Sequence, residues 1–169
     1  EGTSVQAASV SAIVAAGIPV LGHIGIIKQK IVRSGSIRIQ GRTAESAQEI
    51  LNDVVAFANA GVFALVLECI PDKLGDVVTR SLDIPTIGIG AGPGCDGQAL
   101  VTQDMLGIFK EMSPRFLKVY LDLSETIVSA LTQYRMEVEQ GQFPGPEHCY
   151  EIDENELGKL LAQVENIVT

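Results

Sequence analysis

The sequence is poor in basic residues. Its 169 residues include 12 Lys and Arg against 21 Asp and Glu, which gives a formal net charge of -9. Nucleic-acid binding depends on clustered cations that neutralise phosphates, and binding to a membrane surface depends on polybasic segments. Neither pattern is present, so the composition argues against nucleic acid and against a membrane as partners.

Long apolar runs and paired cysteines are also missing. No apolar stretch reaches the roughly 18 residues that a membrane-spanning helix needs. The three cysteines, Cys69, Cys95 and Cys149, form no Cys-x-x-Cys pair, so a zinc knuckle or a redox motif has no support. Isolated thiols fit a reducing compartment. Hydrophobic residues nevertheless make up 46% of the chain, enough for one domain with a buried core.

Three apolar, strand-like runs end at residues suited to binding or catalysis. The run that starts at Ile18 ends at His23, the run that starts at Phe63 ends at Glu68, and residues 84–89 lead into a glycine-rich loop. In parallel α/β proteins the C-terminal ends of the strands lie at one edge, where catalytic and binding groups gather. We therefore expect a site assembled at one edge of a sheet.

Helix-like and strand-like segments alternate along the chain, which predicts an α/β fold with a parallel sheet, either doubly wound or closed into a barrel. Because the strands are apolar on both alternating faces, we expect both sheet faces to be covered. The expected elements are a helix over 4–16, a strand over 18–23, a helix between Thr43 and Gly61, a strand ending at Glu68, a helix over 71–82, strands over 84–89 and 116–120, and helices over 124–140 and 154–167.

Glu68 and His23 are the strongest candidates for site residues. A carboxylate at a strand end among apolar neighbours suits a general base, although it could equally be an ion-pair partner for a nearby helix. His23 could donate a hydrogen bond to a substrate oxygen, bind a metal or titrate, although lone histidines are more often structural. Metal binding is the weakest of these roles, because no second His or Cys stands at ligand spacing.

Other segments carry weaker signals. The loop over residues 88–94 matches neither a dinucleotide-binding fingerprint nor a P-loop, and its glycines instead predict positive φ angles or close approach of a ligand. Arg42 could hold a carboxylate or pair with another subunit. Asp96 and Asp104 are expected to be helix caps or solvated charges, and Glu147-His148 to lie in an exposed turn.

Six motifs together resemble the ketopantoate hydroxymethyltransferase (3-methyl-2-oxobutanoate hydroxymethyltransferase) family, in family order and near family spacing. They are Gly22-His23-Ile24-Gly25, Ile39-Gln40-Gly41-Arg42, Leu65-Val66-Leu67-Glu68-Cys69-Ile70-Pro71, Ile84-Pro85-Thr86-Ile87-Gly88-Ile89-Gly90-Ala91-Gly92, Asp96-Gly97-Gln98 and Phe143-Pro144-Gly145-Pro146-Glu147-His148. Each motif alone is a weak signal, whereas six in register are highly specific.

The resemblance implies a (β/α)8 barrel of the phosphoenolpyruvate/pyruvate type. It also implies transfer of a hydroxymethyl group from 5,10-methylenetetrahydrofolate to 3-methyl-2-oxobutanoate, which gives 2-dehydropantoate for pantothenate and coenzyme A synthesis. Mg2+ bound to the 2-oxo acid would favour enolate formation. A large homo-oligomer is implied, in the cytoplasm or, for a eukaryotic source, an organelle.

By the same resemblance, Glu68 is the proton acceptor, His23 contacts the substrate and Glu1 belongs to the metal site. The family's other metal aspartates, together with a serine and a lysine that hold substrate, have no counterpart here. We therefore expect residues 1–150 to be the C-terminal part of a barrel, about strands five to eight, and 151–169 to be a helical arm. Ile27-Lys28 stands where the family has Thr-Pro, which removes a hydroxyl group and a rigid proline ring beside the site. The details of substrate or folate binding at this position therefore stay open.

Two alternatives remain open. The first is a Mg2+-dependent C–C lyase of the isocitrate lyase or phosphoenolpyruvate mutase type, although the Lys-x-Cys-Gly-type loop of those enzymes is absent. The second is a non-catalytic remnant that keeps only an oligomer surface. Retention of both Glu68 and His23 weighs against the remnant.

Overall fold

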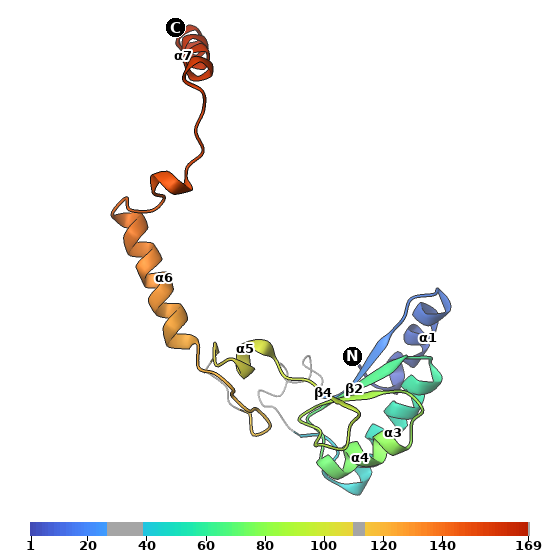
Figure 1. The fold of residues 1–169 in the computed structure, drawn as a ribbon. Helices are drawn as coiled ribbons and strands as arrows, with labels where there is room; N and C mark the ends of the chain where they lie inside the picture. Colours follow the sequence, from blue (N-terminus) through green and yellow to red (C-terminus); the bar gives the residue numbers. More distant parts are fainter. Residues whose placement is uncertain (27–38, 110–113, 169) are drawn as a thin grey trace. The chain divides into compact units, whose positions relative to one another are not determined.

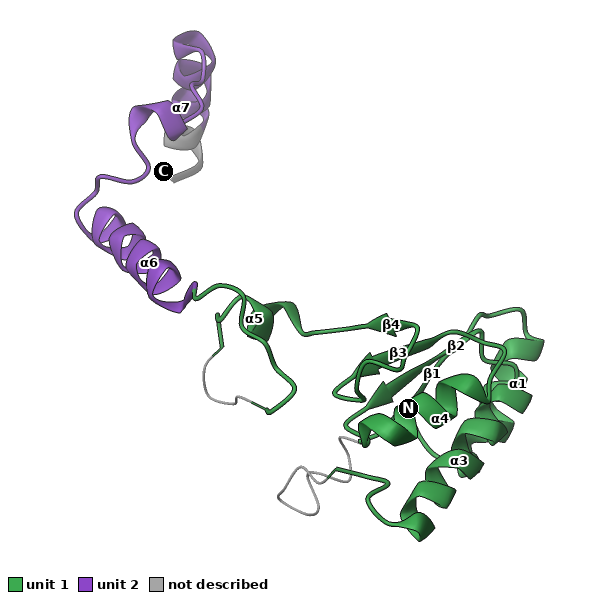
Figure 2. Cartoon of the chain, turned by 60° about the horizontal axis from the view of Figure 1, so that its bottom comes forward, with its two compact units in different colours: residues 1–122 green, residues 123–169 purple. Residues whose placement is uncertain are grey.

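The computed structural model describes residues 1–26, 39–109 and 114–168. It consists of two compact units, residues 1–122 and 123–169 (Figure 2). The boundary predicted at residue 150 falls inside the second unit and stays a prediction. Ile27 and Lys28 lie outside the described residues.

The first unit is built on a four-stranded parallel sheet (Figure 1). Its strands are β1 (Leu21–Gly25), β2 (Ala64–Glu68), β3 (Thr86–Ile89) and β4 (Gly97–Gln98), and they lie side by side in chain order. The predicted α/β fold with a parallel sheet is therefore confirmed. β1 runs two residues past the predicted end at His23, because Gly25 still pairs with Glu68 of β2.

Helices cover one face of this sheet. They are η1 (Ser4–Gln6), α1 (Ala7–Ala15), α3 (Ala44–Asn59) and α4 (Asp72–Arg80). The short α5 (Thr102–Met105) follows β4 and contributes no residue to the core. Thr43 caps α3 as predicted, because its hydroxyl accepts a hydrogen bond from the Ser46 N–H at 3.2 Å. The apolar stripe of α3 packs with α4 against the inward residues of the strands, and the core contains Ile24, Ile50, Val54, Phe57, Leu65, Leu67, Leu74 and Val78.

The opposite face of the sheet is only half-buried. Along β2, Leu65 and Leu67 are fully buried, whereas Val66 and Glu68, which point the other way, are partly exposed. The same alternation occurs in β3, where Thr86 is buried and Ile87 is not. The expectation that both faces are covered is therefore not met within the described residues, since the helices of the core pack on one face only.

The predicted strand over residues 116–120 is wrong. Residues 114–117 form a turn closed by the Leu117 N–H, which donates to the Pro114 carbonyl at 2.9 Å, and Val119 and Tyr120 are exposed. The Tyr120 N–H bonds to the carbonyl of Met105 rather than to a strand of the sheet. β4 takes the fourth place instead, and its two residues, a glycine and a glutamine, carry no apolar alternation by which a strand is recognised.

A partly buried polar network joins β3 to the start of β4. Thr86 is fully buried, and its N–H donates to Oδ2 of Asp96 at 2.8 Å while its hydroxyl donates to the same oxygen at 3.1 Å. The hydroxyls of Thr79 and Thr86 are 2.8 Å apart, which connects the network to α4. Asp96 is therefore not a helix cap, and although the residue is exposed, as expected for a solvated charge, its carboxylate also accepts two hydrogen bonds from Thr86. It is the group that fixes β4 beside β3.

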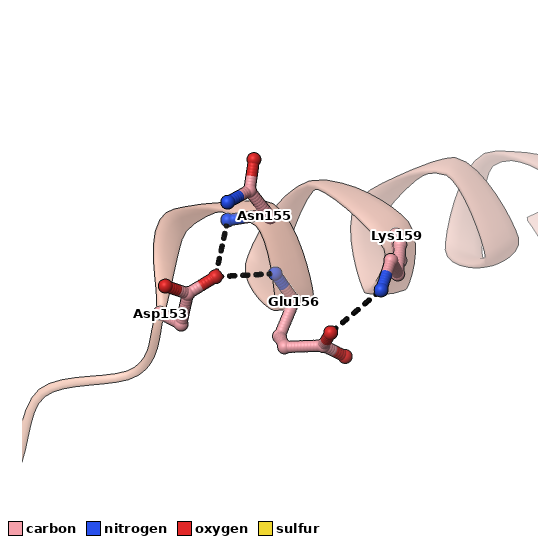
Figure 3. Close-up of polar contacts among 4 residues, drawn as sticks. All are labelled: Asp153, Asn155, Glu156 and Lys159. Carbon is pink, nitrogen blue, oxygen red and sulfur yellow. Dashed lines mark hydrogen bonds and ion pairs between the residues drawn. The ribbon is translucent and has the colours of Figure 1, made fainter.

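The second unit consists of α6 (Ser124–Glu139), η2 (Pro146–His148) and α7 (Glu154–Val168). α7 starts at a local cap, in which Oδ1 of Asp153 accepts from the N–H groups of Asn155 and Glu156 at 2.9 and 3.3 Å (Figure 3). Lys159 pairs with Glu156 at 2.6 Å one turn further on. Of the helices in the described ranges, none has the length and apolar character that crossing a membrane requires.

Thr86→Val tests the polar network. The variant keeps the volume of the side chain but leaves the Asp96 N–H and the Thr79 hydroxyl without this partner, so we expect a loss of about 1–3 kcal/mol in the free energy of unfolding. The matched control is Thr132→Val, which removes an exposed hydroxyl that bonds within its own helix. Denaturant unfolding followed by circular dichroism measures both, and equal effects of the two substitutions would contradict the assignment.

Candidate functional site

His23 and Glu68 form a direct pair at the C-terminal edge of the sheet. Nε2 of His23 lies 2.8 Å from Oε2 of Glu68, and each side chain is 19% exposed. Gly25 pairs with Glu68 in the β1–β2 register, so His23 lies two residues back along β1 and on the same face as Glu68. An ionised carboxylate only accepts hydrogen bonds, so Nε2 of His23 is the donor.

A close approach of backbone holds these two strand ends together. Gly25 has a φ of +116°, and the carbonyl oxygen of Glu68 occupies the space that a Cβ at position 25 would need. The same carbonyl accepts a hydrogen bond from the Ile26 N–H at 3.1 Å. Glycine is therefore required at this position, because any side chain would push β1 away from the residue that carries the carboxylate.

Glu1 lies beside the same edge. The Gly2 N–H donates to the His23 carbonyl at 3.3 Å, which places the start of the chain alongside β1. The structure therefore brings His23 and Glu68 into contact, and the hydrogen bond of Gly2 places the backbone next to Glu1 beside β1. Their individual roles stay predictions.

The described residues do not complete a metal site. Within residues 1–26, 39–109 and 114–168, no group of three or more His, Cys, Asp or Glu side chains is arranged to hold a metal ion. Glu1 offers one carboxylate, and the carboxylate of Glu68 already pairs with His23. A Mg2+ site normally uses near-octahedral oxygen coordination, which this set alone does not supply.

Cys69, directly after Glu68, has a backbone conformation that sequence reasoning missed. Its φ of 54° is left-handed, which is uncommon for a residue other than glycine. Its N–H donates to the Ile89 carbonyl at 2.9 Å, and its carbonyl accepts from the Gln40 N–H at 3.3 Å. Burial, with a smaller contribution from the neighbouring Glu68 charge, raises the pKa of the Cys69 thiol to about 11. The thiol is therefore a neutral, apolar group beside the site.

The glycine-rich loop after β3 adopts the positive φ angles that the sequence predicts. Gly90 and Gly92 have φ values of 68° and 81°. The loop lies close against α4, where Gly75 leaves room for the Ala91 carbonyl. The amide of Gln98 donates to the Gly92 carbonyl at 2.9 Å and fixes the loop from the side of β4.

The remaining candidates belong to other elements of the chain. Arg42 is an exposed residue before α3, and Asp104 lies in the first turn of α5. Glu147 and His148 form an exposed turn in η2 of the second unit, where Nδ1 of His148 accepts from the Gly145 N–H at 3.2 Å. The predicted exposed turn at Glu147-His148 is therefore confirmed.

Comparison with known proteins gives consistent matches. A sequence model described as ketopantoate hydroxymethyltransferase matches residues 1–146. A 3-methyl-2-oxobutanoate hydroxymethyltransferase of Clostridium novyi (strain NT) is 48% identical over 160 residues, which are 95% of this chain and 58% of that protein. The enzymes of that name from Moorella thermoacetica and Nitratidesulfovibrio vulgaris (strain DP4) are 51% and 46% identical, over 89% and 98% of this chain and 56% and 54% of their own lengths. The chain thus spans little more than half the length of these relatives.

Thiol alkylation tests the environment of Cys69. Because the raised pKa of about 11 keeps this buried thiol protonated near neutral pH, we expect Cys69 to react with iodoacetamide at pH 8 far more slowly than the exposed Cys149, by about two orders of magnitude. Its rate should rise as the pH approaches the thiol pKa. Peptide mass spectrometry over a time course resolves the two sites, and comparable rates for both cysteines would contradict the burial of the thiol.

Proposed function

Because the chain belongs to the ketopantoate hydroxymethyltransferase family, we propose that the protein transfers a hydroxymethyl group from 5,10-methylenetetrahydrofolate to 3-methyl-2-oxobutanoate. The products are 2-dehydropantoate and tetrahydrofolate, and water supplies the oxygen of the new hydroxyl group. The observation that carries the proposal is the His23–Glu68 pair, a carboxylate and an imidazole at the strand ends of a parallel sheet.

In this proposal Glu68 is the general base. Its carboxylate takes the proton from C3 of the 2-oxo acid, and the electron pair of the C–H bond passes into an enolate whose C3 then bonds to the one-carbon unit. The side chain is partly buried, which limits competition from water, but it still has 19% of its surface accessible for a substrate. The apolar residues on the same sheet face, Val66 and Ile87, suit the isopropyl group of the substrate.

His23 has two successive tasks in this proposal. In the free protein its Nε2–H donates to Glu68 and holds the carboxylate at the strand edge. When Glu68 turns toward C3 of the substrate, the same N–H becomes available to a substrate oxygen. A histidine is suited to this exchange because the donor stays in place while its acceptor changes.

We propose further that the sheet is part of a (β/α)8 barrel, with residues 1–150 as its C-terminal part and 151–169 as a helical arm. The half-buried sheet face that carries His23 and Glu68 would face the barrel interior, which agrees with its apolar neighbours. The partial coverage of the relatives, 54–58% of their lengths, is compatible with this arrangement. A homo-oligomer and a cytoplasmic location belong to the same proposal, and the free thiols suit a reducing compartment.

The metal requirement is also a proposal. Glu1 is the residue that we propose as a Mg2+ ligand, because the chain start lies beside β1 at the edge where Glu68 is found. The described residues do not complete the site, so further ligands would have to come from elsewhere. The proton transfer to Glu68 described above does not depend on how those ligands are arranged.

Glu68→Gln tests the base directly. The amide keeps the size of the side chain but accepts no proton, so exchange of the C3 proton of 3-methyl-2-oxobutanoate for deuterium should fall by about 10²–10⁴-fold. Proton NMR in deuterium oxide measures this exchange in the intact protein without any folate. Glu45→Gln, an exposed carboxylate in the first turn of α3, is the matched control and should exchange normally. Exchange at the wild-type rate in Glu68→Gln would remove Glu68 from its role.

The two histidines of the chain allow a second matched comparison. His23→Gln removes the imidazole that holds Glu68 and meets the substrate, so we expect the KM for the 2-oxo acid to rise about tenfold or more. His148→Gln changes an exposed histidine in η2 and should leave KM unchanged. Steady-state kinetics of both variants provides the measurement, and an unchanged KM in His23→Gln would contradict the substrate-binding role.

A further inference from the structure

Cys69, directly after the proposed base, has a backbone conformation that is unfavourable for its residue type. Its φ is 54°, whereas every other residue with positive φ in residues 1–26, 39–109 and 114–168 is a glycine. A residue with a side chain is strained there, because its Cβ lies too close to the following carbonyl oxygen. Such a residue keeps a left-handed conformation only where its surroundings hold it, and such residues cluster at functional sites.

Hydrogen bonds to three segments hold Cys69 in this conformation. The peptide group between Glu68 and Cys69 bonds to both neighbouring strands: its carbonyl accepts from the Ile26 N–H at 3.1 Å, and its N–H donates to the Ile89 carbonyl at 2.9 Å. The Cys69 carbonyl accepts from the Gln40 N–H at 3.3 Å. In an extended residue the N–H and the carbonyl point to the same neighbouring strand. Those of Cys69 bond to different segments, so the chain has to turn at this residue.

The same peptide group sets the direction of the Glu68 side chain. Glu68 pairs in register with Gly25 on one side and with Ile89 on the other. Because the carbonyl of Glu68 and the following N–H are both bonded, the backbone at Glu68 cannot rotate without leaving one of these groups unpaired. The carboxylate therefore stands on the half-buried sheet face, 2.8 Å from Nε2 of His23.

The Cβ of Cys69 adds a restriction that a glycine would not supply. The left-handed region open to residues with a side chain is small, with φ of about +50° to +70°. Cys69 lies inside it. Glycine populates positive and negative φ about equally, so a glycine here would let the end of β2 sample other directions. The side chain of Cys69 thus narrows the range of directions in which Glu68 can point.

The reactivity of the thiol does not account for a cysteine at this position. Burial, followed by the neighbouring Glu68 charge, raises the pKa of the Cys69 thiol to about 11. The thiolate is the reactive form of cysteine, so this thiol is a poor nucleophile near neutral pH. The contribution that remains to Cys69 is the shape of its backbone and side chain.

Cys69 also lines a pocket of about 460 Å³, together with Asp72, the glycine loop after β3 and Phe116. The ring of Phe116 lies over Gly90, and the Cβ of Asp72 lies beside Gly92. A shorter side chain at residue 69 would therefore border a hollow that already exists, rather than leave a new void in the packed core. This allows residue 69 to be truncated without loss of the fold.

We propose that Cys69 is a positioning residue for Glu68. Its Cβ confines the end of β2 to the left-handed turn and so holds the carboxylate in the direction from which it takes the C3 proton of the 2-oxo acid. The inference rests on the proposed function, in which Glu68 is the base, and adds a residue that acts through Glu68. No bond to Cys69 forms or breaks in the reaction.

The test compares Cys69→Ala with Cys69→Gly in the intact protein, by C3 deuterium exchange at varied concentrations of 3-methyl-2-oxobutanoate. Alanine keeps the Cβ and removes only the thiol, so its kcat should stay close to the wild-type value. Cys69→Gly should lower kcat about tenfold with unchanged KM, because a displacement of about 1 Å in a reacting group can cost about a hundredfold. Cys149→Gly, at an exposed thiol of the second unit, is the matched control and should leave kcat unchanged.

A second measurement follows the strand end without any substrate. Amide hydrogen exchange by NMR reports how often the bond from the Ile26 N–H to the Glu68 carbonyl opens. Exchange at Ile26 should be about two- to fivefold faster in Cys69→Gly than in Cys69→Ala, because glycine gives the chain more freedom. The Ile127 amide in α6 is the control and should exchange equally in both variants. Circular dichroism checks that both fold, as expected for glycine and alanine beside an existing pocket.

The results separate this inference from the function on which it rests. Equal kcat values in the two Cys69 variants would overturn it, whether both match the wild type or both lose activity, since an equal loss would assign the effect to the thiol. A lower kcat and faster Ile26 exchange in Cys69→Gly alone support it. If Glu68→Gln exchanges C3 at the wild-type rate, the proposed base is wrong. The Ile26 comparison then still decides whether Cys69 holds the strand end.

Discussion

The close approach of β1 to β2 at their C-terminal ends is the constraint on which the site depends. Gly25 has no side chain, so the Glu68 carbonyl can lie against it and accept from the Ile26 N–H. This contact sets the register of the two strands and so places His23 and Glu68 on one face, at 2.8 Å. A parallel pair shifted by one residue would turn one of the two side chains into the helix-covered core. The backbone contact at Gly25, rather than the attraction between the two side chains, therefore determines where His23 and Glu68 lie.

The strands that carry the site were predictable because their apolar runs are long and end at conspicuous residues. The cap at Thr43 and the positive φ angles of Gly90 and Gly92 followed from local backbone rules, which depend on few neighbours. β4 was missed because a Gly-Gln pair shows no alternation of apolar and polar residues. Its position depends instead on the hydrogen bond that the Thr86 N–H donates to the Asp96 carboxylate. The strand predicted over 116–120 failed for the opposite reason. Its residues have strand-like composition, but the turn at Pro114 directs the chain away from the sheet.

The residues of the site also differ in how far the sequence predicts them. Glu68 and His23 could be identified from the sequence, because each ends an apolar strand. The left-handed backbone of Cys69 and the pocket that Cys69 lines arise from tertiary contacts alone. Asp72 and Phe116 are 44 residues apart, and only the fold of the glycine loop brings them to one cavity. The pairing of the β1 and β2 ends follows directly from the register of two neighbouring strands. The pocket forms only where three separate segments of the chain meet. Prediction from sequence is therefore better for the base than for the groups that would surround a bound molecule.

The connection from β3 to β4 has a mechanical consequence. Only residues 90–96 separate these parallel strands, far fewer than the dozen or more that such a crossover usually takes. This short segment is held to α4 through Gly75, to β4 through Gln98 and to the strand start through Asp96. Such a segment has few soft degrees of freedom, so a molecule that binds it meets a surface already in its final shape. The segment therefore loses little conformational entropy when a molecule binds to it. Selectivity would depend on how well the shape of the molecule matches this fixed surface, and not on a loop that closes over it.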